Sequence, residues 1–229
     1  MNFENLQKLA RIPLIKNLIK VEWQAAIIGV LSLTLVFAVW QRLNSRKTNG
    51  IFEYSSPLVM KGGDPYLRAL MRTISASESQ DTNPYTQLYG GEHFSDFSRH
   101  PNKCVKIVSG LHQGECSTAA GRYQILTVTW QEKFAKYHSK LPINLSINHN
   151  IFTPLAQDEV IYTWLNDHDA WKADIALLLK QGKLNQVLQI LSGTWTSLGY
   201  GIENNSVTPK LPKIYQKLLS EELMSAKIK

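Results

Sequence analysis

The stretch that decides the fold is DPYLRALMRTISASES, residues 64–79. Asp64 is a suitable helix cap, and Pro65 suits the first turn of a helix. The apolar residues behind them recur at steps of three and four: Leu67, Leu70, Met71 and Ile74. This spacing predicts an amphipathic helix that buries one face and ends near Glu78.

The chain downstream of this helix changes its pattern twice. Residues 85–110 lose the helical period and are rich in glycine, aromatic and short polar residues, which predicts short strands and loops. Helical patterns return at about 125–139, 154–168, 170–181, 183–193 and 209–223. One helix, a small sheet region and a run of helices predict an α+β domain over residues 64–223, followed by a tail at 224–229.

The chain upstream of this helix has a different character. Residues 25–40 (AAIIGVLSLTLVFAVW) carry no charge, and with residues 21–24 they supply the roughly twenty residues that a bilayer-spanning helix needs. We therefore predict a transmembrane helix over 21–40, preceded by segment 1–20 and followed by a polar linker over 41–63. A buried core helix would show an apolar stripe, and a cleaved signal peptide would end in small residues.

Charge around this span favours one orientation by a narrow margin. Four basic residues precede the span and three follow it: Lys8, Arg11, Lys16 and Lys20, then Arg42, Arg46 and Lys47. Because cytoplasmic flanks carry the excess of Lys and Arg, the count leans towards a cytoplasmic N-terminus.

The overall composition limits the partners and cofactors. A formal net charge of +7 predicts a polyanionic partner such as nucleic acid, a membrane surface or a cell wall. The lysines are dispersed and form no reader motif, so we do not expect nucleic acid. Cys104 and Cys116 have no zinc-site spacing, which favours a disulfide over two free thiols. The six histidines show no tight ligand spacing, so neither a metal nor a cofactor is expected.

Glu78 is the candidate for chemistry. It follows Ile74 by four residues and Met71 by seven, so it lies on the apolar face at the C-terminal end of the predicted helix. Desolvation and the helix terminus would both raise the carboxyl pKa to roughly 6–7, the range of a general acid at neutral pH. Spacing alone also allows a solvent-facing glutamate in a fraying last turn.

Four sequence blocks accompany Glu78. They are Ser-Glu-Ser at 77–79, Tyr-Gly-Gly-Glu-His-Phe-Ser-Asp-Phe-Ser-Arg-His-Pro at 89–101, Ser-Thr-Ala-Ala-Gly-Arg-Tyr-Gln-Ile-Leu at 117–126, and Trp-Thr-Ser-Leu-Gly-Tyr-Gly at 195–201. In order and spacing, from about residue 67 to residue 215, the chain resembles the bacteriophage lambda endolysin family. The resemblance implies a lysozyme-like fold and a lytic transglycosylase that cleaves the bond between N-acetylmuramic acid and N-acetylglucosamine in peptidoglycan.

The resemblance also implies roles for individual residues. Glu78 would be the catalytic acid/base, producing a 1,6-anhydro ring without a second carboxylate nucleophile. The expected substrate contacts are Tyr123 and Gln124 in the cleft, Gly121 beside a close-approaching backbone or sugar, Tyr200 in support of the acid, and Trp195. The loop between Cys104 and Cys116 would lie over the cleft. Plain turn or helix-start roles remain open for Gln124 and Tyr200.

A hydrolase would need a partner acid about 5–9.5 Å from the first. The candidates are Asp81, Glu92, Asp96 and Glu115. We favour a turn role for Asp81, whereas Glu92 and Asp96 would share a strand face and either contact substrate or hold loops. Thr86 stands where the family pattern has an acidic residue before the double glycine.

Together these observations predict a single-pass protein of the bacterial inner membrane, with a cytoplasmic N-terminus and a periplasmic catalytic domain. The expected partners are peptidoglycan strands, the lipid bilayer through residues 21–40, and components of an envelope machine or lysis system. The alternatives are a hydrolytic muramidase of the same fold and a catalytically silent peptidoglycan-binding component of a secretion or phage apparatus.

Overall fold

The computed structural model describes residues 55–79, 81–108, 110, 112–138, 151–200 and 206–227. The predicted segment 1–20, the predicted span 21–40 and linker residues 41–54 lie outside the described residues. Within the described ranges, every helix is too short or too polar to cross a bilayer.

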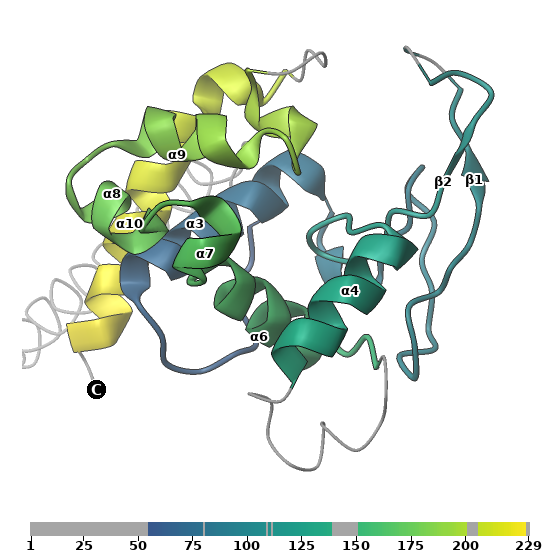
Figure 1. Cartoon of the computed structure of the whole chain (residues 1–229), viewed down its shortest axis with the longest axis horizontal. Helices are drawn as coiled ribbons and strands as arrows, with labels where there is room; N and C mark the ends of the chain where they lie inside the picture. Colours follow the sequence, from purple (N-terminus) through teal and green to yellow (C-terminus); the bar gives the residue numbers. More distant parts are fainter. Residues whose placement is uncertain are drawn as a thin grey trace, which may run out of the picture. The chain divides into compact units, whose positions relative to one another are not determined.

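Helix α3 (Pro65–Glu78) forms at the predicted position, but the prediction that it buries only one face is wrong, because Leu67 and every residue from Ala69 to Ser77 are buried. Asp64 caps it by accepting hydrogen bonds from the backbone N–H groups of Tyr66 and Leu67. The predicted apolar stripe is fully buried: Leu67, Leu70, Met71 and Ile74. Figure 1 shows α10 (Leu211–Lys227) lying along α3, which also contacts α6 and α8.

The sheet region is small. Strands β1 (Val105–Lys106) and β2 (Cys116–Ser117) pair antiparallel, with Val105 opposite Ser117, and lie at the edge of the domain (Figure 1). The predicted disulfide between Cys104 and Cys116 joins the two arms of this hairpin. Helix η1 (Pro84–Thr86) and isolated bridges at Gln87–His93 and Leu88–Ala120 complete the region.

The remaining helices follow in the predicted order. They are α4 (Thr127–Tyr137), α6 (Pro154–Leu165), α7 (His168–Trp171), α8 (Ile175–Lys180) and α9 (Leu184–Leu191), then η3 (Thr196–Leu198), η4 (Thr208–Lys210) and α10. The α+β prediction is therefore confirmed. The predicted tail 224–229 is wrong for residues 224–227, because Glu222 forms salt bridges with Arg68 and Arg72 of α3 and the helix continues to Lys227.

The predicted linker 41–63 is wrong for residues 55–63, which pack on the domain. Residues 55–60, called the strap below, bury the side chains of Leu58 and Met60 in the core. The fully buried carboxylate of Asp158 in α6 accepts hydrogen bonds from the N–H groups of Val59 (2.7 Å) and Met60 (3.1 Å).

A buried cation binds the other half of the strap. The Arg122 guanidinium donates to the carbonyl oxygens of Ser56 and Pro57. The Tyr85 hydroxyl lies between the two charges, accepting from Arg122 (3.0 Å) and donating to Asp158 Oδ2 (2.8 Å). Tyr123 donates to Asp158 Oδ1 (2.6 Å). Burial raises the pKa of both tyrosine hydroxyls, so both remain protonated donors.

We expect Asp158→Ala to lower the free energy of unfolding by about 3–5 kcal/mol, because it leaves several buried donors without an acceptor and the buried Arg122 charge without a counter-charge. Chemical denaturation of the full chain, followed by circular dichroism, measures the change. Asp169→Ala, at an exposed position on α7, is the control and should stay within about 0.5 kcal/mol of the parent. Equal stabilities of the two variants would contradict a structural role for the strap.

Candidate active site

Glu78 is the last residue of α3, and its half-buried side chain is held from η3. The Ser197 hydroxyl donates a hydrogen bond to Glu78 Oε1. Ser77 in turn donates to Ser197 Oγ at 2.5 Å, and both serines are buried. Thr208 Oγ1 donates to the Ser197 carbonyl oxygen at 2.7 Å, which fixes the backbone of η3 at this point. A chain of hydroxyl groups therefore restrains one oxygen of the glutamate.

A second set of contacts fixes the segment that follows Glu78. Ser79 closes the helix by donating its N–H to the Ser75 carbonyl oxygen (2.8 Å), and its hydroxyl donates to Gln87 Oε1 (2.5 Å). The Gln124 side-chain amide donates to the carbonyl oxygens of Gln87 (3.3 Å) and Gly121 (3.0 Å). The predicted cleft residue Gln124 is thus two hydrogen bonds away from the residue next to Glu78.

The segment 81–93 carries a local polar cluster. Asp81 Oδ1 accepts from the Asn83 N–H (2.6 Å), and Asp81 Oδ2 lies 3.5 Å from His93 Nε2. Thr86 donates its hydroxyl to the Asn83 carbonyl oxygen, and its Oγ1 lies 2.7 Å from His93 Nδ1. The hydroxyl of Thr86 is therefore engaged in closing this turn, and Asp81 has the turn role expected for it.

The other candidate acids are engaged in local contacts. Glu92 pairs with Lys103, whose hydrogen bond and charge lower the pKa of the glutamate. Asp96 accepts from Ser98, and those hydrogen bonds lower the pKa of Asp96. Glu115 lies 3.1 Å from His112. The described chain has no regular strand at 92–96, so the expected shared strand face of Glu92 and Asp96 is wrong; both are exposed loop residues. Lowered pKa values keep Glu92 and Asp96 ionised at neutral pH, which does not suit a proton donor.

Several predicted substrate contacts are internal instead. Tyr123 is 1% exposed and bonded to Asp158, while Trp195 is 2% exposed and donates Nε1–H to the Tyr123 carbonyl oxygen. A Cβ at Gly121 would lie 2.4 Å from Gln157 Oε1, so the close approach at this glycine comes from a protein side chain. The placement of these three residues in the cleft is therefore wrong. Tyr200 is 59% exposed and has a φ of 63°.

The sequence analysis missed Ser197 and Gln87, which contact Glu78 and Ser79. Ser197 lies inside the 195–201 block, but the roles predicted for that block were assigned to Trp195 and Tyr200. Its signal was its place, with Thr196, as one of two short polar residues in a block otherwise made of apolar, aromatic and glycine residues. Gln87 had no signal, because its side chain acts within a segment without periodic structure. No three His, Cys, Asp or Glu side chains cluster as metal ligands within the described ranges.

A glutamate at the end of a buried first helix, a short antiparallel hairpin and a following set of helices define a lysozyme-like protein. The chain matches the family described as Endolysin over residues 68–221. It is 32% identical to the endolysin of Escherichia phage lambda over 144 residues, covering 58% of this chain and 79% of that protein. It is 25% identical to the endolysin of Escherichia phage P2 over 158 residues, covering 62% and 86%.

A solved structure agrees with these matches. Bacteriophage lambda lysozyme in complex with a chitohexasaccharide aligns with a TM-score of 0.51 and 26% identity, covering 69% of this chain and 97% of that chain. The chain therefore belongs to the Endolysin family, and the resemblance drawn from the four sequence blocks is confirmed. The strap lies N-terminal to the matched residues, which begin at Arg68.

Proposed function

We propose that this endolysin is a lytic transglycosylase that cleaves peptidoglycan between N-acetylmuramic acid and N-acetylglucosamine, with Glu78 as acid and base. The carboxylic acid would protonate the glycosidic oxygen as the bond from C1 breaks. The C6 hydroxyl oxygen of the same muramic acid would then bond to C1 and return its proton to Glu78. Atoms balance without water, and the product ends in a 1,6-anhydro ring.

The observation that carries this proposal is the contrast between Glu78 and the other acids. Glu78 is half-buried and restrained by a buried hydroxyl. Asp81, Glu92, Asp96 and Glu115 each have a local partner. A mechanism with one working carboxylate uses this arrangement directly, whereas a two-carboxylate hydrolase would have to disengage one of these acids.

The first test is mass spectrometry of muropeptides that the full chain releases from purified sacculi. We expect anhydromuropeptides from the parent, and a release rate lower by about 10²–10⁴-fold from Glu78→Gln, because the amide cannot supply an acidic proton. Glu132→Gln, at an exposed position on α4, is the control and should match the parent. Reducing-end products would support the hydrolytic muramidase, and no release by the parent would support the silent wall-binding component.

The hydroxyl chain behind Glu78 gives a second test. Ser197→Ala removes the donor to Glu78 Oε1, and hydrogen bonds to charged groups contribute about 1.5–3 kcal/mol. We expect kcat to fall by about 10- to 100-fold while KM stays within a factor of two or so, because the loss concerns the orientation of the acid. Ser197→Thr keeps a hydroxyl and should recover part of the rate. A change in KM alone would contradict the positioning role.

We further propose that residues 21–40 anchor the chain in the bacterial inner membrane, with the N-terminus in the cytoplasm and the catalytic domain in the periplasm. The support is the uncharged apolar run and the balance of basic residues around it. This location would place the domain beside its substrate and beside any envelope or lysis partners.

Fractionation of expressing cells tests the anchor. The parent should stay with the membranes after alkaline extraction, and protease added outside spheroplasts should digest its domain. The double substitution Leu31→Arg and Leu33→Arg should release the chain, since each central arginine costs about 2.5–3.5 kcal/mol on insertion. Extraction of the parent into the supernatant would contradict the proposal.

A further inference from the structure

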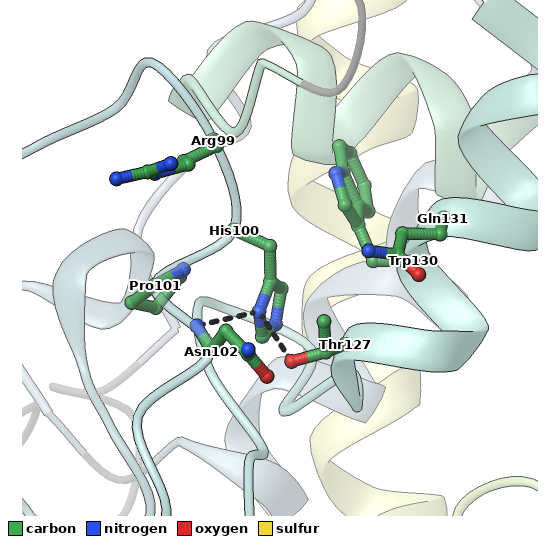
Figure 2. A pocket seen from close by; sticks show the side chains of 7 residues that line it. All are labelled: Arg99, His100, Pro101, Asn102, Thr127, Trp130 and Gln131. Carbon is green, nitrogen blue, oxygen red and sulfur yellow. Dashed lines mark hydrogen bonds between the residues drawn. The ribbon is translucent and has the colours of Figure 1, made fainter.

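A cavity of about 430 Å³ lies outside the contacts around Glu78, between loop 99–102 and the start of α4. Figure 2 shows the side chains that line it: Arg99, His100, Pro101, Asn102, Thr127, Trp130 and Gln131. The volume falls within the roughly 300–1,000 Å³ of pockets that hold small organic ligands. None of the substrate residues predicted from the sequence lines this cavity.

The imidazole of His100 holds the two walls of the cavity together. Its Nε2 lies 2.9 Å from the Ile125 carbonyl oxygen, which can only accept, so Nε2 carries the hydrogen. Its Nδ1 accepts from the Asn102 backbone N–H (3.2 Å) and faces Thr127 Oγ1 at 3.0 Å, contacts that Figure 2 draws. The ring is therefore neutral, and burial lowers the His100 pKa in the direction that keeps it so. The walls are fixed by this ring before any ligand binds.

The groups that face the cavity are suited to carboxylates and amides. Arg99 is exposed, and its positive charge acts on the nearby carboxylate of Asp96, whose pKa it helps to lower. The side-chain amides of Asn102 and Gln131 line the cavity and can both donate and accept hydrogen bonds. Trp130 is 0% exposed and packs edge-on against Phe152, so it offers no open ring face on which a sugar could stack.

We propose that this cavity binds the peptide stem that peptidoglycan carries on muramic acid. The proposal rests on the function proposed above. Within peptidoglycan the lactyl carboxylate is consumed in the amide bond to the stem, so the free carboxylates belong to the peptide. The Arg99 guanidinium matches a carboxylate in charge and in its two-pronged geometry. Asn102 and Gln131 match the peptide amide groups.

The cavity shares a structural element with the candidate active site. On one side of the turn at 120–127, the Gln124 side chain donates to the carbonyl oxygen of Gln87, whose own side chain accepts from Ser79, the residue after Glu78. On the other side, facing the cavity, the Ile125 carbonyl oxygen and the Thr127 hydroxyl contact the imidazole of His100. A peptide stem bound in the cavity is thus held by the turn that packs against the segment after Glu78, which lets the stem help align the glycan.

The experiment compares the full chain on two substrates: glycan strands with their stem peptides, and the same strands stripped by an N-acetylmuramoyl-L-alanine amidase. We expect the parent to show kcat/KM at least about tenfold higher on peptide-bearing strands, the effect of one charge-assisted hydrogen bond. Arg99→Gln should lose this preference and keep the parent rate on stripped strands. Asn102→Gly removes an amide at a left-handed position and should reduce the preference in the same way. Lys213→Gln, an exposed site on α10, is the charge-matched control and should behave as the parent.

Equal parent rates on both substrates, or an unchanged preference in Arg99→Gln, would overturn the cavity proposal while leaving the proposed function intact. Failure of the parent to cleave either substrate would instead count against the proposed function. The cavity is then tested by titrating the chain with soluble muramyl tripeptide and following backbone amide shifts by NMR. Shifts at 99–102 and 127–131 in the parent, absent in Arg99→Gln, support the proposal, and no shifts reject it.

Discussion

Two buried charges that share one tyrosine hydroxyl are the constraint on which the described structure depends. Asp158 and Arg122 are both fully buried, and Tyr85 joins them by accepting from the guanidinium and donating to the carboxylate. A buried charge is costly unless its hydrogen-bonding capacity is used. The strap meets that need, because its carbonyl oxygens face Arg122 and its N–H groups face Asp158. Without the strap, Arg122 would keep only its side-chain bond to Tyr85 among these contacts, and Asp158 would keep only its bonds to Tyr85 and Tyr123.

This network gives the Ala-Gly-Arg-Tyr-Gln block a structural meaning. The side chains of Arg122 and Tyr123 point inward to the strap and to Asp158, whereas the side chain of Gln124 and the N–H of Gly121 both donate to the Gln87 carbonyl oxygen in the segment that follows Glu78. Gly121 allows the turn because its φ is 74° and the Gln157 amide occupies the space of a side chain. The block therefore connects the buried charges to the C-terminal end of α3, because Gln124 bonds to Gln87 and Gln87 bonds to Ser79.

The sequence predicted those features that a local pattern determines. The first helix, its Asp64 cap and the burial of its stripe follow from spacing, and the order of the later helices follows from the same period. The disulfide followed from the spacing of the two cysteines, which does not suit a zinc site. Motif membership predicted which segments meet near Glu78 but not the direction of each side chain, so Tyr123 and Trp195 were assigned to a cleft although they are buried. The direction of a side chain depends on which buried polar groups need hydrogen-bond partners. Nothing in the sequence indicated that Asp158 would be buried and would need such partners.

The strap escaped prediction for a related reason: Arg122 and Asp158 hold it through its own backbone groups, and backbone groups are the same in nearly every residue. Only the placement of Arg122 and Asp158 in the core shows that the strap's carbonyl and N–H groups are needed as partners for these two buried charges.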